Sequence, residues 1–265
     1  MNKSNIKDLS IQISLSGLSF CILNRTSNSI EFTHYKAFKK QANPFETLEY
    51  LKQELTNLDA LDQTFSNVLV IYQNGLSNLV PKALYEEEQA ADYLKFNSKI
   101  LNTDYISHDE ISINDSINVY VPYVNINNYI FDTFGEFEYK HSSTILIESL
   151  LKETAESKTA IYININEHHF ELVAIKGNEL LLYNSYEYSS KEDVIYYLLF
   201  AMEQLQLHPE TTQLNLMGLI DKEDDIYSII YTYVRHVEFY QPHYKFTFQT
   251  HPKHLHRDAI LLNSF

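Results

Sequence analysis

Alternation of apolar and polar positions divides the N-terminal part of the chain into a regular series of elements. The segment Leu9–Leu15, "LSIQISL", alternates and is typical of a strand, while the apolar run Phe20–Asn24, "FCILN", predicts a central strand. A third strand is predicted at Ile30–Phe38, "IEFTHYKAF". Because only short polar turns separate these segments, we expect a three-stranded meander.

A helical pattern follows the meander. Asn43 is a candidate N-cap, and Pro44 suits the first helical position. Apolar residues then recur at helical spacing, at Phe45, Leu48, Leu51, Leu55 and Leu58. The apolar run Asn67–Tyr72 predicts a buried strand, so the first part of the chain should run strand, strand, strand, helix, strand.

The same order is predicted again in the second half. Strands are expected at Ala160–Asn166, at Phe170–Ile175 and in "ELLLYNSYEY" after a short turn. Ser190 is a candidate N-cap for the next helix, with Asp193 as an acidic residue of its first turn. Thr212–Gly218, "TQLNLMG", is expected to form the closing strand.

The two halves also match residue by residue at a fixed separation. Adding 150 to the residue number carries Ile11, Ile13, Leu15 and Phe20 onto Ile161, Ile163, Ile165 and Phe170. Two matched copies of a five-element order indicate an internal duplication.

The remaining segments predict connecting elements. "EEEQAADYLKFN" and "NINNYIFDTFG" predict helices, the second ended by Gly135, and "DYISHDEI", "INVYVPYV" and "EFEYKH" predict strands. "SSTILIESLLKETAESK" and "DKEDDIYSIIYTYVRHV" predict two further helices, and "YKFTFQT" a last strand. We therefore expect a first lobe at 1–155, with inserted and connecting elements, and a second at 156–265 whose last segment could pack back on the first.

This organisation resembles the actin-like ATPase fold, an α/β fold in which duplicated ribonuclease H-like units form two lobes. The fold is shared by actin, sugar kinases, the heat-shock chaperone ATPases and pilus-assembly proteins such as PilM. The phrases "VPKALYEEEQAADYLKFN" and "HSSTILIESLL" are also similar to an uncharacterised bacterial family, known only as a domain of unknown function with this fold. The resemblance covers nearly the whole chain.

The resemblance also implies where a nucleotide site would lie. In active members, nucleotide binds between the lobes, and the first hairpin of each lobe carries Asp-x-Gly at the end of its first strand. The matching positions here are Ser14-Leu15-Ser16 and Asn164-Ile165-Asn166, without either aspartate or glycine. Gly17 comes one position late, and a glycine pair after the last core strand is reduced to Gly218.

Composition limits the classes of partner and the cellular location that we expect. The net charge of −15 disfavours nucleic acid, because the average field of the surface would repel phosphates. No apolar run is long enough for a membrane-spanning helix or a signal peptide, so we expect a cytoplasmic protein without membrane insertion. The single cysteine, Cys21, excludes an intrachain disulfide and lies in an apolar run, as a buried neutral thiol would.

Other polar clusters have simpler interpretations than catalysis. His168 and His169 fall at a hairpin turn, and the runs Glu86–Glu88 and Asp221–Asp225 fall at helix starts, where acidic residues suit the helix dipole. Ser142 and Ser143 follow His141 and suit a helix N-cap. The C-terminal "HPKHLH" offers His251, His254 and His256, which could hold zinc or nickel with one further ligand; an ordinary terminal segment is the interpretation we favour, so no metal site is predicted.

These patterns leave three functional hypotheses. The first is a non-catalytic interaction or scaffold module that binds another protein and needs no cofactor. The second is a nucleotide-binding switch that holds ATP or ADP, with magnesium, weakly between the lobes; Ser14, Ser16, Gly17, Asn164, Asn166 and Gly218 would line the site. The third is a kinase or hydrolase of unknown substrate with unrecognised acidic groups. Because the carboxylates that would organise magnesium are missing, we favour the first and predict no catalytic residues.

Overall fold

The protein is described by a computed structural model that covers residues 6–153 and 158–265. The chain divides into two compact units. The first comprises Met1–Leu146 with Tyr244–Pro252 and Ile260–Phe265, and the second comprises Ile147–His243 with Lys253–Ala259. The predicted lobe boundary between 155 and 156 lies outside the described residues.

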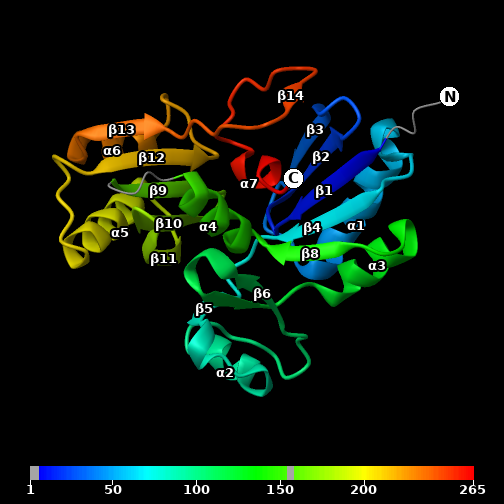
Figure 1. The fold of residues 1–265 in the computed structure, drawn as a ribbon, viewed down its shortest axis with the longest axis horizontal. Helices are drawn as coiled ribbons and strands as arrows, with labels where there is room; N and C mark the ends of the chain where they lie inside the picture. The colour runs from blue at the N-terminus through cyan, green and yellow to red at the C-terminus, as the bar shows by residue number, and fades with distance from the viewer. Residues whose placement is uncertain (1–5, 154–157) are drawn as a thin grey trace. The chain divides into compact units, whose positions relative to one another are not determined.

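The first unit is built on a six-stranded sheet with the order β14-β3-β2-β1-β4-β8 (Figure 1). Its strands are β1 (Lys7–Ile13), β2 (Gly17–Asn24), β3 (Ser29–Ala37), β4 (Asn67–Tyr72), β8 (Glu138–His141) and β14 (Thr247–Phe248). The first three form an antiparallel meander, and β4 runs parallel to β1. This is the predicted arrangement of the meander and its closing strand.

Helices and a second, smaller sheet complete this unit. The helices are α1 (Pro44–Asn57), α2 (Ala90–Lys95), α3 (Val124–Phe134), the start of α4 (Ser142–Glu153) and most of α7 (Ala259–Leu262). Strands β5 (Ser77–Pro81), β6 (Ser107–Ile111) and β7 (Ser116–Tyr120) form an antiparallel sheet in the order β5-β7-β6, against which α2 packs. Short 3₁₀ turns occur at Asp59–Leu61, Lys82–Leu84, Glu87–Gln89 and Ser112–Asn114.

The second unit repeats the architecture of the larger sheet. Its strands are β9 (Thr159–Ile165), β10 (His169–Lys176), β11 (Glu179–Glu187), β12 (Gln213–Gly218) and β13 (His236–Phe239), in the order β11-β10-β9-β12-β13. Helices α5 (Lys191–Gln204) and α6 (Asp225–Tyr233) pack against each other. Both units therefore contain three antiparallel strands, a helix and a strand parallel to the first.

Matching local signals start the first helix of each unit. The Asn43 side chain accepts hydrogen bonds from the amides of Phe45 and Glu46, and the Glu46 carboxylate accepts the Asn43 amide in return. Ser190 and Asp193 form the same reciprocal box at the start of α5. Each box satisfies amides that a helix leaves without partners, so the two predicted N-caps are confirmed.

The correspondence between the first hairpins differs from the predicted one by two residues. Adding 152, not 150, carries Lys7–Ile13 onto Thr159–Ile165 and Gly17–Asn24 onto His169–Lys176. The backbone bonds agree: Ser14 N donates to Gly17 O at 3.0 Å, and Asn166 N donates to His169 O at 2.9 Å. An even shift keeps every side chain on its face of the sheet, so the apolar pattern alone could not reveal the error.

Each unit has its own apolar core. In the first, Ile11 and Val70 from the sheet and Leu51 from α1 are fully buried. In the second, β9, β12 and α5 supply most of the core, including Ile163 and Leu198. Phe45 departs from the predicted helical face, since it is 75% exposed near the start of α1.

Several predicted elements are corrected by the structure. The helix expected over "DKEDDIYSIIYTYVRHV" ends at Tyr233, and the strand β13 follows; β5 was not predicted at all. The helix expected over "EEEQAADYLKFN" is reduced to one 3₁₀ turn and α2, and the last predicted strand to β14. The helix predicted through Lys158 is described only to Glu153, because 154–157 lie outside the described residues.

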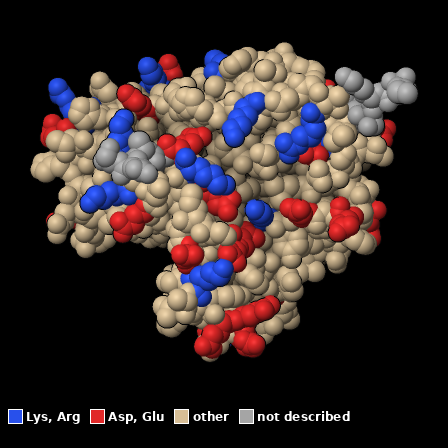
Figure 2. Space-filling model, viewed as in Figure 1, with Lys and Arg blue, Asp and Glu red and all other residues tan. Residues whose placement is uncertain are grey.

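The surface charge is unevenly spread. On the face shown in Figure 2, acidic side chains gather over the part of the first unit that carries α2. Within 6–153 and 158–265, none of the helices combines the length and the apolar character needed to cross a membrane.

Candidate functional site

The turn after β1 is closed by the side chain of its first residue. Ser14 Oγ accepts hydrogen bonds from the amides of Ser16, at 3.2 Å, and Gly17, at 3.0 Å, and donates to Gly17 O at 3.1 Å. The carbonyl groups of Leu15 and Ser16 accept the amides of Ala42 and Phe38. A serine hydroxyl therefore takes the amides that this turn could otherwise offer to an anion.

Gly17 is required because the neighbouring strand leaves no room for a side chain, and not because a ligand approaches the backbone there. A Cβ at this position would lie 2.8 Å from Lys36 O and 3.1 Å from a ring carbon of Tyr35. Both residues belong to β3, so the missing side chain lets the meander close. Ser14, Ser16 and Gly17 thus lie together in one compact turn.

The corresponding turn of the second unit begins at Asn166, which takes the place of Ser14. Its carbonyl accepts the Tyr188 hydroxyl at 2.6 Å, and its side-chain amide lies 3.3 Å from His169 Nε2. Burial lowers the pKa of the His169 imidazole and raises the pKa of Tyr188 to about 12. The side chains that contact this turn, His169 and Tyr188, are therefore polar but favour their neutral forms.

Asn164 and Gly218 lie beside this turn, at the carboxyl ends of β9 and β12. Asn164 is 5% exposed and donates from Nδ2 to Glu171 Oε2, its cross-strand neighbour, at 2.7 Å. The other Glu171 oxygen accepts the Tyr183 hydroxyl at 3.1 Å. A Cβ on Gly218 would lie 2.5 Å from Asn164 Oδ1 and 2.2 Å from Ile165 O, so β9 and β12 approach closely only because Gly218 is glycine.

Two residues at these strand ends were not singled out by the sequence. With the corrected correspondence, the partner of Asn164 in the first unit is Gln12, whose Nε2 donates to Gln73 Oε1 at 2.8 Å. Glu171 is almost fully buried, and the signal that could have marked it is that it is the one charged residue in the apolar run Phe170–Ile175. It lies on the face of β10 opposite the core residues Phe170, Leu172 and Ala174.

His141 and Ser143 lie in a buried polar network at the start of α4, next to Ser142, whose buried hydroxyl has no hydrogen-bond partner among the described residues. Ser143 Oγ lies 2.7 Å from His141 Nδ1, which also accepts the Ser143 amide at 3.2 Å. These contacts leave the ring proton on Nε2, which faces Asn74 O at 3.1 Å. All three residues are fully buried, and the Asp109 carboxylate binds the His141 amide and the Thr144 hydroxyl rather than the ring. The distance between Ser143 Oγ and His141 Nδ1 would suit a nucleophile and its base, but complete burial keeps both from a substrate, so we interpret the network as structural.

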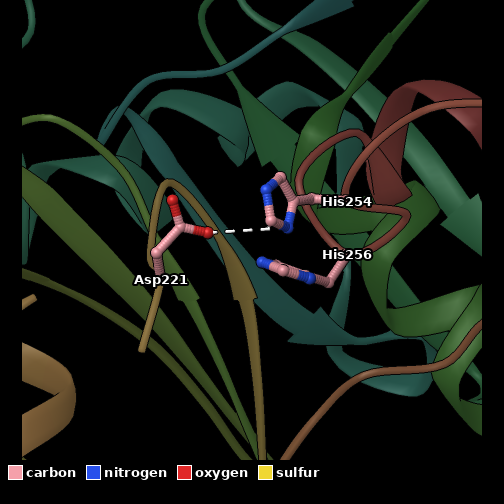
Figure 3. Close-up of side chains that lie close together, drawn as sticks. All are labelled: Asp221, His254 and His256. Carbon is pink, nitrogen blue, oxygen red and sulfur yellow. Dashed lines mark ion pairs between the residues drawn. The ribbon is translucent and has the colours of Figure 1, made fainter. Parts of the chain in front are cut away.

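The C-terminal histidines meet an aspartate from a distant part of the sequence. Asp221, His254 and His256 present ligand atoms that all lie within 4.8 Å of one another (Figure 3). Asp221 comes from the acidic run that follows β12, and the Arg257 guanidinium binds its carboxylate. Burial lowers the pKa of His256. His251 lies outside this group, against Phe248.

Solved structures of other proteins have the same fold. A crystal structure from Bacteroides thetaiotaomicron VPI-5482, of a protein with actin-like ATPase fold and unknown function, covers 99% of this chain and 96% of its own, with a TM-score of 0.82 and 20% identity. A PilM–PilN type IV pilus biogenesis complex matches over 98% of this chain and 97% of its own, with a TM-score of 0.63 and 13% identity. At these identities the likeness shows the fold alone.

The sequence itself points to one family. None of the curated proteins shows significant similarity to the chain. A family model described as "Protein of unknown function (DUF3822)" matches residues 1–237, which is most of the sequence. The chain, with its actin-like ATPase fold, therefore belongs to the DUF3822 family.

Proposed function

We propose that this protein is a non-catalytic, cytoplasmic binding module that uses an actin-like fold to hold another protein. The observation that carries the proposal is the closed turn after β1. There the Ser14 hydroxyl accepts the amides of Ser16 and Gly17, which in an active relative would be free to contact phosphate. A nucleotide would have to displace this hydroxyl before it could bind these amides.

The charge at the strand ends supports the same conclusion. Magnesium in nucleotide sites is held by carboxylates, yet the residues that follow β1 and β9 are Ser14 and Asn166. The nearby carboxylate of Glu171 is buried and already accepts hydrogen bonds from Asn164 and Tyr183. These residues fit a magnesium nucleotide poorly, and no catalytic step is assigned to them.

Protein binding is supported by the exposed apolar side chains around α2. Phe96 is 88% exposed, and Leu84, Leu101 and Tyr105 are more than half exposed. The acidic run Glu86–Glu88 belongs to the same segment. Large apolar side chains next to acidic ones suit a basic amphipathic segment of a partner protein. PilM, which shares the fold, has been solved in complex with PilN.

Nucleotide titration tests the non-catalytic part of the proposal. We expect millimolar ATP or ADP with magnesium to leave the unfolding midpoint unchanged and to release no phosphate. A ligand at 100 times its Kd would stabilise the fold by about 2.7 kcal/mol, which such a titration detects readily. A rise of the unfolding midpoint with nucleotide would support the nucleotide switch instead. Steady phosphate release would support the kinase or hydrolase.

Cross-linking in the native cell tests the binding part. Phe96→Ser should abolish a cross-linked species of defined mass that wild type forms, because it removes an exposed apolar side chain without creating a cavity. Phe45→Ser is the matched control, since Phe45 is also exposed, at 75%, but lies on α1. Equal cross-linking by the two variants would contradict the assignment of the α2 segment as the binding surface.

A further inference from the structure

We propose that Asp221, His254 and His256 bind a divalent transition-metal ion of the zinc class at the carboxyl end of β12. All three residues belong to the second unit. Figure 3 shows their side chains directed at one another, two from the C-terminal segment and one from the loop after β12. Two imidazoles and one carboxylate are a donor set that proteins use repeatedly for zinc.

The fold brings the two segments together through backbone bonds. Gly218 N donates to His256 O at 2.9 Å, which attaches the segment Lys253–Ala259 to the end of β12. The loop after β12 is ordered by Asp224, whose carboxylate accepts the Asp221 amide at 2.7 Å. The positions of the three side chains are therefore set by the backbone and not by chance contacts of a free terminus.

The distances suit an ion that draws the side chains together slightly. A tetrahedral zinc with bonds of about 2.0–2.1 Å separates its ligand atoms by about 3.3 Å. Asp221 Oδ1 lies 3.6 Å from His254 Nδ1, and the longest separation within the group does not exceed 4.8 Å. Asp221 and His254 each have 28% of the side chain exposed, so the ion can enter from solvent.

His256 is the fixed member of the group. It is 5% exposed, its ring lies 4.5 Å from the Phe239 ring, and its Nε2 lies 2.9 Å from Ile220 O. Coordination through Nε2 would move the proton to Nδ1 and replace this hydrogen bond. Water can complete the ligand set, as it does in zinc sites with three protein ligands.

Arg257 orients the carboxylate. Its guanidinium binds Asp221 Oδ2, while Oδ1 faces His254. This leaves one carboxylate oxygen free to coordinate, in the way that outer hydrogen bonds orient metal ligands elsewhere. The two imidazoles favour zinc, nickel or copper over magnesium or calcium, which prefer oxygen ligands.

Metal titration of the full chain, stripped with a chelator and carrying no histidine tag, tests the proposal. Calorimetry with Zn²⁺ should show one ion per chain, and Co²⁺ should give the visible absorption bands of a low-coordinate site. Zn²⁺ should raise the unfolding midpoint, and chelator should reverse the rise. The proposal would be overturned if the chain failed to bind one Zn²⁺ with a Kd of 100 μM or tighter, which corresponds to a binding free energy of about 5.5 kcal/mol.

Single substitutions show whether the ion occupies this group. His254→Ala and Asp221→Asn change half-buried side chains, so the variants should fold, and each should weaken Zn²⁺ binding at least about tenfold. His251→Ala, on the same segment but outside the group, should bind as wild type does. Wild-type affinity in His254→Ala and Asp221→Asn would show that the three residues form only a polar clamp on β12.

Discussion

Gly218→Ala should destabilise the second unit strongly, because both the conformation and the surroundings of Gly218 exclude a side chain. Its φ is +83°, a value that side chains other than glycine rarely adopt. A Cβ would lie 2.2 Å from Ile165 O and 2.5 Å from Asn164 Oδ1. To relieve these contacts, β9 and β12 would have to separate at their carboxyl ends.

The expected loss follows from three contributions. Alanine in a left-handed conformation costs about 1–2 kcal/mol. Separating the strands would break the bond from Leu219 N to Ile165 O, and the accompanying shift of Gly218 would break the bond from its N to His256 O in the C-terminal segment, each worth about 1 kcal/mol. The variant should therefore lose roughly 3–4 kcal/mol of unfolding free energy, or about 10 °C of the midpoint.

Urea unfolding followed by circular dichroism measures this loss, since the chain has no tryptophan to report by fluorescence. Gly75→Ala is the matched control: a Cβ there meets nothing within 4 Å, and the backbone has no positive φ. It should change the unfolding free energy by less than about 0.5 kcal/mol. If Gly218→Ala were as stable as Gly75→Ala, the conclusion that β9 and β12 approach too closely at Gly218 for a side chain would be contradicted.

Three further predictions follow from the first unit. Leu51→Ala should cost about 2–5 kcal/mol of unfolding free energy and Phe45→Ala less than about 0.5, although both follow the same helical spacing, because Leu51 is buried and Phe45 exposed; equal losses would contradict the packing of α1. Burial raises the pKa of Asp109 from its ordinary value of 3.8, so the folded state favours the protonated acid, and stability is lost as pH rises through the raised pKa. Asp109→Asn should remove that loss, so the unfolding free energy of the variant minus that of wild type should increase as pH rises above about 4. Unfolding free energies that change with pH in the same way in both proteins would refute this. Asn43→Ala should cost about 1 kcal/mol in thermal unfolding, since it removes the cap of α1, and an unchanged midpoint would show that the cap contributes nothing.

Local signals predicted the elements well because their causes lie within a few residues. Asn43 with Glu46 and Ser190 with Asp193 start their helices through bonds made inside the first turn. The alternation at Leu9–Leu15 and Ala160–Asn166 gave strands for the same reason. Prediction failed where a strand depends on pairing outside its own segment: β13 pairs with β12, and its first two residues were taken for the end of a helix.

The alignment of the two hairpins shows a different limit. A shift of two residues leaves the apolar faces unchanged, so the sequence supports the offsets 150 and 152 equally. The strand ladders decide between them, since Ile13 pairs with Leu18 and Ile165 with Phe170. As a result Ser14 corresponds to Asn166, and Asn164 to Gln12. Descent of the two units from one duplicated segment stays a prediction.

The group around His256 could be predicted only in part. The sequence marked His254 and His256 as possible ligands for zinc or nickel, but Asp221 was assigned to a helix start and the histidines to an ordinary terminal segment. Their meeting depends on the attachment of Lys253–Ala259 to β12, a contact between segments far apart in the sequence. No local pattern carries that information.

Calorimetric titration of the wild-type chain with Mg–ATP and Mg–ADP tests the central claim most directly. If Ser14 has taken the amides that would hold phosphate, and the strand ends lack the carboxylates that hold magnesium, neither nucleotide should give a binding isotherm at millimolar concentration. The same samples should release no phosphate over hours. A saturable isotherm with one nucleotide per chain, weakened by a bulky substitution at Ser14 or Asn166, would contradict the account.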